Sequence, residues 1–308
     1  MIRTYSGNDI GGVIGLWNDV LCEHSVDRRA FVKNVLLDMN FDPCGFFVSE
    51  NDGIIDGFVH TVVRGYPVDA GAPCEEERGY INVIAVRDDG YETVGRELIA
   101  CAERYIAEKG KRIVRVSDYS PNYFHPGICT RYGGLIGLFE SCGYTGLHRL
   151  QSIGIDLHRY KVPDDITVLK RLRMSEGYDF TALRDELIPS LLTYASPGWT
   201  HRYRRLLNET FDYERFCLAV FDGEVIGCAV FGDPYSCDER FGPFSVNEKF
   251  RGLGLGKILL SDTLAAMKRK GLRHAWAQST STDGPAAKMY EKAGFYKTDE
   301  FVVMEKSL

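Results

Sequence analysis

The chain has 308 residues, of which 44% are hydrophobic and 26% are charged, and its formal net charge at pH 7 is −6. These are the values of a globular protein, and the length suits two domains of about 150 residues each. The acidic balance argues against nucleic acid as the main partner, and no apolar run is long enough to cross a membrane. We therefore expect two globular domains with neither a nucleic-acid nor a membrane partner.

The nine cysteines are scattered and form no C-x-x-C pair. This pattern indicates neither a disulfide framework nor a zinc motif, so we predict no metal site. Cys217 and Cys228 lie inside apolar runs and are expected to be buried thiols. The N-terminus opens without a hydrophobic signal segment, and a reducing cytoplasm is the expected location.

In the first half, a short strand precedes a helix that starts near residues 8–10. Two apolar segments, 46–48 and 58–63, then flank the turn Asn51-Asp52-Gly53, which is typical of a β-hairpin. A helical face of Val94, Leu98, Ala102 and Tyr105 follows, and Gly110 ends it.

The second half repeats this plan. Segments 216–221 and 225–231 flank Asp222-Gly223, and segment 241–246 has the place that 80–86 has in the first half. A period of about half the chain indicates a duplicated domain rather than a solenoid. We place the boundary in the polar stretch after residue 160, which gives domains 1–160 and 161–308, both of mixed α/β class.

The most informative stretch follows residue 246. Glycines alternate there between Arg251 and Lys257, after a strand that contains Phe244 and Val246. A helical face then recurs through Leu260, Leu264 and Met267. Glycines permit the left-handed turn that free N–H groups need to surround an anion, and both basic side chains favour a phosphate.

The spacing excludes two common phosphate loops. G-x-G-x-G is one residue shorter than the dinucleotide fingerprint, and Ile258 stands where a P-loop needs a hydroxyl for Mg²⁺. The stretch resembles instead the pyrophosphate loop of the GNAT (GCN5-related) N-acetyltransferases, [QR]-x-x-G-x-[GA], which Arg251, Gly254 and Gly256 fill. A glycine-rich turn without a ligand remains the alternative.

A second match lies downstream, where the family has N-x-x-A-x-x-x-Y-x-x-x-G-F. Ala286, Tyr290, Gly294 and Phe295 fit it, while Asp283 replaces the usual asparagine. A buried core tyrosine remains the alternative role for Tyr290.

The resemblance covers the whole chain, strongly in the second half and moderately in the first. It implies tandem GNAT folds, each a twisted mixed sheet flanked by helices. It also implies acetyl-CoA as cosubstrate and an amine of a small molecule or peptide as acceptor. The residues that it places at acetyl-CoA are Phe244, Ser245, Val246, Arg251, Gly252, Leu253, Gly254, Leu255, Gly256, Lys257, Asp283 and Lys288.

Strand 241–246 is expected to splay from its neighbour around 276–280, so that the pantetheine arm can pair with its edge. Tyr290 is the expected general acid for the leaving thiolate. The base stays open between Asp238, Glu239, and Gln278 acting through a water. The amine would attack directly in a ternary complex.

The first copy departs from the family pattern. Its turn lacks the arginine, Thr93 replaces a loop glycine, and acidic Asp88, Asp89 and Glu92 crowd the phosphate position. Phe139 stands at the tyrosine position and has no proton to donate. We therefore expect a catalytically silent domain, although backbone contacts to the cofactor remain an alternative.

The first copy also carries an extra segment, 119–128, which resembles a Phe-x-Pro-Gly-Ile element of some tandem members. It could line a substrate pocket or pack on its own domain, and His125 is expected to be structural.

Two other functions stay open: a non-catalytic acyl-CoA-binding regulatory protein, and a nucleotide-dependent enzyme. The sequence names neither the acceptor amine nor the oligomeric state.

Overall fold

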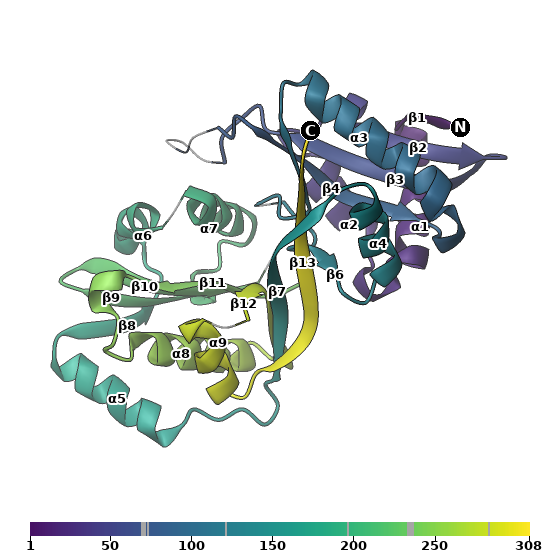
Figure 1. The fold of residues 1–308 in the computed structure, drawn as a ribbon. Helices are drawn as coiled ribbons and strands as arrows, with labels where there is room; N and C mark the ends of the chain where they lie inside the picture. The colour runs from purple at the N-terminus through teal and green to yellow at the C-terminus, as the bar shows by residue number, and fades with distance from the viewer. Residues whose placement is uncertain (69–71, 73, 121, 196, 233–236, 283) are drawn as a thin grey trace. The chain divides into compact units, whose positions relative to one another are not determined.

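The computed structural model describes residues 1–308 except 69–71, 73, 121, 196, 233–236 and 283 (Figure 1). The chain forms two compact units. Unit 1 comprises Met1–Gln151 and Asp299–Leu308, and unit 2 comprises Ser152–Thr298. Both mix strands and helices, as the alternating apolar segments predict.

In unit 1 the neighbouring strands follow the order β1-β2-β3-β4-β5-β13-β7, and β6 pairs with β13. The strands are β1 (Ile2–Thr4), β2 (Phe46–Asn51), β3 (Ile54–Val63), β4 (Arg78–Val86), β5 (Ile113–Val116), β6 (Ile128–Cys129), β7 (Thr145–Asp156) and β13 (Tyr296–Ser307). The main helices are α1 (Ile10–Val20), α2 (Arg28–Phe31), α3 (Arg96–Glu108) and α4 (Gly133–Ser141).

The local signals of unit 1 form the predicted elements. β2 and β3 pair antiparallel up to Asn51 and Ile54, and positive φ angles of 51° at Asp52 and 80° at Gly53 make the tight hairpin turn. The predicted face of α3 packs with α4 in one core cluster, and α1 packs in another cluster against β2 and β3. The helices therefore cover both faces of this sheet.

In unit 2 four strands form the sheet β11-β10-β9-β8, and β12 lies beside β7. The strands are β8 (Tyr178–Ala182), β9 (Phe216–Phe221), β10 (Glu224–Phe231), β11 (Phe241–Val246) and β12 (His274–Ser281). The helices are α5 (Asp164–Ser175), α6 (Ile188–Tyr194), α7 (Pro197–Thr210), α8 (Leu255–Arg269) and α9 (Pro285–Lys292).

Unit 2 repeats the hairpin, with Asp222 and Gly223 at positive φ between β9 and β10. The predicted apolar face of α8 is buried through Leu260, Leu264 and Met267. Figure 1 shows α8 and α9 on one face of this sheet and α6 and α7 on the other. Among the described helices, none is both long and apolar enough to cross a membrane.

The compact units divide the chain differently from the predicted domains. The C-terminal end of β13 belongs to unit 1, where Met304 pairs with Val116 and Ser307 with Ile113. The end of β7, from Ser152 onward, belongs to unit 2. Residues 152–160, which the predicted boundary assigned to the first domain, therefore lie in unit 2. Residues 299–308, which it assigned to the second domain, lie in unit 1. Periodicity along one segment cannot reveal such an exchange, because it depends on which distant strand pairs with which.

Candidate functional site

The strands β11 and β12 part almost as soon as they meet. Arg240, just before β11, forms a single parallel bridge with Trp276, and the Trp276 N–H donates to the Glu239 carbonyl at 3.0 Å. Beyond this point the two strands belong to different sheets. β11 pairs with β10 along one edge, so among the described strands its other edge has no ladder partner after residue 240. This is the splay that the resemblance implies.

A left-handed turn connects β11 to α8. Gly252 has φ of +85° and Gly254 has φ of +79°, values that are costly for any residue with a Cβ. At Gly254 a Cβ would also approach Leu169 Cδ2 to 2.6 Å. The Arg173 guanidinium of α5 donates from Nε to the Leu253 carbonyl at 2.9 Å, which fixes the turn from outside. The turn geometry thus requires glycine at positions 252 and 254, whereas Gly256 lies within α8.

The turn presents a row of backbone N–H groups without acceptors. The N–H of Arg251 donates to the Glu248 carbonyl and that of Lys257 to the Gly254 carbonyl. For the five residues between them, Gly252 to Gly256, no acceptor is recorded in the described part of the chain. Five successive donors at the start of a fifteen-residue helix are an anion-binding arrangement.

The predicted cofactor side chains surround this turn. Phe244 and Val246 project toward Gly256, where a Cβ would lie 3.5 Å from Phe244 Cζ and 3.9 Å from Val246 Cγ2. Leu255 is buried and anchors α8 in the core. The structure therefore places β11 and the helix start side by side, as a strand–turn–helix site requires.

Three basic side chains near the turn are exposed. The Arg251 side chain is 66% exposed and pairs with Glu248 at 3.0 Å. Lys257 and Lys288 are exposed, and no ion pair is recorded for either within the described residues. Asp283 lies outside the described residues, and Gly284 caps α9.

Tyr290 of α9 packs against the aromatic side chains of β11. Its ring packs edge-on against Phe241, with centroids 6.0 Å apart, and contacts Phe244 and Phe295. The residue is 7% exposed and belongs to the core cluster of unit 2. Its hydroxyl has no recorded hydrogen bond to a described residue, and it is not among the polar atoms sealed from solvent. Burial raises the pKa of the phenol above its usual value, so the group carries its proton at neutral pH.

Sequence reasoning missed Tyr194 of α6. Its hydroxyl lies 2.7 Å from Ser245 Oγ, on the strand whose far edge is free. Burial raises the pKa of Tyr194 to about 12, and the bond to Ser245 opposes that shift. No motif reports this pair, because α6 and β11 are separated by about fifty residues and meet only in the folded sheet.

The three candidate bases differ in their surroundings. Glu239 Oε1 accepts from the N–H groups of Arg273 and His274, so it secures the start of β12. Asp238 pairs with Arg215 at 2.8 Å. Gln278 is half-buried and has no recorded side-chain partner in the described chain. Both carboxylates are therefore engaged by other groups of unit 2.

The equivalent segment of unit 1, residues 88–95, does not form a left-handed glycine turn. Residues Asp88–Gly90 and Tyr91–Gly95 form consecutive helical turns that run directly into α3, without left-handed glycines. Phe139 is fully buried in the core. In a continuous helix the backbone N–H groups bond to carbonyls of the preceding turn. Within the described residues, segment 88–95 therefore offers no row of free donors comparable to that of unit 2.

The family match falls within unit 2, the unit that holds the glycine turn. Residues 181–295 match the acetyltransferase (GNAT) family. A mycothiol acetyltransferase of Acidothermus cellulolyticus is 30% identical over 126 residues, which cover 35% of this chain and 38% of the relative. This chain therefore spans well under half of that relative's length.

Solved structures with similar folds extend over the whole chain. The glucosamine N-acetyltransferase region of a fungal multi-domain GH3 β-N-acetylglucosaminidase has a TM-score of 0.80 at 17% identity, covering 99% of this chain and 38% of that one. A tandem GNAT protein of the clavulanic acid biosynthesis pathway has a TM-score of 0.65 at 16% identity, covering 100% and 98%. Residues 181–295 are thus similar to the acetyltransferase (GNAT) family, and the whole chain has a fold similar to that of a tandem GNAT protein.

Proposed function

We propose that this protein is an N-acetyltransferase that uses acetyl-CoA, and that unit 2 carries the reaction. The observation that supports this best is the row of unpartnered N–H groups from Gly252 to Gly256 beside the free edge of β11. Acetyl-CoA supplies a diphosphate, an amide-containing arm and an activated thioester. The described residues fit the first two, because the N–H groups suit the diphosphate and an unpaired strand edge suits the amides.

Different residues of unit 2 would bind acetyl-CoA and stabilise the transition state. Arg251 and Lys257 add positive charge at the turn, and Lys288 does so at α9. The backbone of Phe244 to Val246 orients the thioester, and an N–H near Val246 stabilises the oxyanion that forms during attack. The amine nitrogen attacks the carbonyl carbon directly in a ternary complex. The new C–N bond forms, the C–S bond breaks, and the thiolate takes a proton.

Tyr290 is the proposed source of that proton. Because burial raises its pKa, the phenol is protonated at neutral pH but is a weaker acid than an exposed tyrosine. Transfer is then favourable only as the thiolate charge develops. The amine would lose its own proton to water, since Asp238 and Glu239 are both engaged by the protein.

Unit 1 is proposed to be a degenerate copy that contributes fold rather than chemistry. The acceptor is proposed to be an amine of a small molecule or peptide. Two relatives carry names that mention acetyl transfer, one of them to glucosamine, and an amino sugar therefore belongs among the acceptors to test.

One observation favours a second function, a non-catalytic acyl-CoA-binding protein. The Tyr290 ring is part of the core, which is also where a purely structural tyrosine would lie.

Two assays on the full chain separate these functions. Thermal unfolding with acetyl-CoA, CoA, ATP and NAD identifies the ligand, since a bound ligand raises the melting temperature by mass action. Release of free thiol is then followed with glucosamine, an aminoacyl compound and a lysine peptide. We expect stabilisation by acetyl-CoA and CoA, with amine-dependent thiol release. Stabilisation without any amine-dependent release supports the binding protein, and stabilisation by ATP or NAD alone contradicts both.

A further inference from the structure

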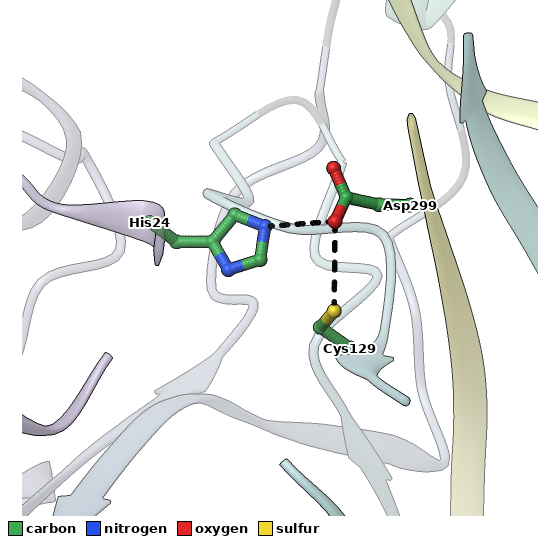
Figure 2. A group of neighbouring side chains, drawn as sticks. All are labelled: His24, Cys129 and Asp299. Carbon is green, nitrogen blue, oxygen red and sulfur yellow. Dashed lines mark hydrogen bonds and ion pairs between the residues drawn. The ribbon is translucent and has the colours of Figure 1, made fainter. Parts of the chain in front are cut away.

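Unit 1 holds three side chains with metal-ligand chemistry at one point. His24 ends the short turn Cys22–His24, Cys129 ends β6, and Asp299 lies in β13. One donor atom from each, an imidazole nitrogen, a sulfur and a carboxylate oxygen, lies within 4.8 Å of the other two. Figure 2 shows the three groups converging from separate segments.

The distances are close to those of a coordination sphere. Asp299 Oδ1 lies 3.9 Å from His24 Nε2 and 3.8 Å from Cys129 Sγ. Zinc bonds of about 2.0–2.3 Å in tetrahedral geometry put ligand atoms roughly 3.3–3.8 Å apart. Small side-chain movements would therefore close the site. Cys129 is buried, and the side chains of His24 and Asp299 are 9% and 16% exposed.

The surroundings orient the imidazole. The Tyr132 hydroxyl lies 3.0 Å from His24 Nδ1, so Nε2 is the nitrogen that faces Asp299. A partner on the second ring nitrogen is the usual arrangement for a metal-ligating histidine.

A cation already lies against the cluster. The Arg131 guanidinium bonds Asp299 Oδ1 and also pairs with Glu23 at 3.1 Å. The Arg131 side chain is 46% exposed. It can therefore move away from Asp299 toward Glu23 and remain in contact with solvent. The guanidinium is thus a competitor for any metal ion at this point, because both need the same carboxylate oxygen.

We propose that His24, Cys129 and Asp299 bind a thiophilic divalent cation of the Zn²⁺ class in place of the Arg131 guanidinium. A sulfur and an imidazole select Zn²⁺ over Mg²⁺ and Ca²⁺, which prefer oxygen ligands. Binding releases the Cys129 thiol proton to solvent, and water completes the coordination. The ion would tie β13 to β6 and to the turn that ends at His24. Sequence spacing gives no sign of this site, because its ligands come from three distant segments.

Cobalt absorption tests the site on the full chain after chelator treatment. Co²⁺ bound to a thiolate absorbs through sulfur-to-metal charge transfer, and Zn²⁺ should displace it. We expect one Co²⁺ per chain, loss of the thiolate band in Cys129→Ser, and an unchanged band in the control Cys44→Ser, whose thiol is exposed. Arg131→Gln removes the competitor and should tighten Co²⁺ binding about ten-fold, since a charge beside the metal is lost.

The Arg131 variant keeps the test decisive even if Cys129→Ser fails to fold. A purely structural ion-pair network predicts that Arg131→Gln loses stability and gains no metal affinity. Absence of a thiolate band in both wild type and Arg131→Gln, with native circular dichroism, overturns the proposal. A band that survives in folded Cys129→Ser also overturns it.

Discussion

The hydroxyl of Tyr194 lies 2.7 Å from Oγ of Ser245, and this hydrogen bond joins α6 to the middle of β11. It lies on the face of the strand opposite to Phe244 and Val246, which face Gly256. The free edge of β11 is therefore held from one face by a helix and from the other by the start of α8.

A double-mutant cycle measures this link. We expect Tyr194→Phe and Ser245→Ala each to lower the free energy of unfolding by about 0.5–1.5 kcal/mol, with a double mutant less destabilised than the sum, because each single change already breaks the bond. Urea unfolding gives the values. Strict additivity would show that the bond contributes nothing.

If the strand orients the thioester, Tyr194→Phe should also raise the KM for acetyl-CoA a few-fold. Thr193→Val is the neighbouring control, because the hydrogen bond recorded for its hydroxyl within the described residues goes to the Pro189 carbonyl of its own helix. An unchanged KM in Tyr194→Phe would show that the bond is purely structural.

Tyr290→Phe removes the proposed acid while keeping the ring in its core position. We expect kcat to fall roughly 10- to 1000-fold, the usual range for general acid catalysis, with little change in acetyl-CoA affinity. Tyr160→Phe is the control, since Tyr160 is partly buried against the same core cluster of unit 2 and its hydroxyl lies 2.8 Å from Ser261 Oγ. Steady-state thiol release checks both. Equal activity of Tyr290→Phe and wild type would assign Tyr290 to the core alone.

Gly254→Ala tests the left-handed turn. We expect a loss of about 1–2 kcal/mol from the positive φ alone, a further loss from the contact with Leu169, and a raised KM for acetyl-CoA. Gly271→Ala has the same backbone strain, with φ of +81°, but nothing within 4 Å of the new Cβ. It should therefore be destabilised less and keep its KM. Equal KM values in the two variants would remove the turn from cofactor binding.

Acid should loosen unit 1 through Asp42. Burial alone would raise the pKa of this carboxyl, but hydrogen bonds from Lys109, the Cys44 N–H and Tyr105 outweigh it and lower the pKa to about 2. A lowered folded-state pKa stabilises the fold above the ordinary value of 3.8, and that stability disappears as the pH falls from 3.8 toward 2.

We expect this term to be about 1 kcal/mol after allowance for solvent screening. Hydrogen exchange of α3 amides, which lie next to the Tyr105 and Lys109 contacts, measures it. Exchange should accelerate with acid in wild type and depend less on pH in Asp42→Asn, whereas Asp19→Asn, at a side chain 64% exposed, should behave like wild type. Equal acid dependence in wild type and Asp42→Asn would contradict the assignment.

Local signals predicted much of this molecule. The two Asp-Gly hairpins are confirmed because a two-residue turn with positive φ specifies its own register. The helix after the glycine loop is confirmed because its apolar period marks its buried face. Cys217 and Cys228 are buried as expected, and burial raises the pKa of Cys217 to about 11.

What the sequence could not predict depends on long-range contacts. The return of β13 to unit 1 is set by pairing across about 190 residues, as between Met304 and Val116. The engagement of Glu239 with Arg273 and His274 is equally invisible in a local pattern. A motif can locate Tyr290, but only packing against Phe241 and Phe295 decides how deeply its ring is buried.

Calorimetric titration of acetyl-CoA into the full chain tests most directly whether the glycine turn of unit 2 holds the cofactor. We expect one site per chain, weakened about ten-fold or more in Arg251→Gln/Lys257→Gln, with a smaller dependence on salt. Glu248→Gln should act the other way and tighten binding, because it releases Arg251 from its ion pair. Affinity that is unchanged in both variants, or no binding by the wild-type chain, would contradict an acetyl-CoA site at residues 251–257.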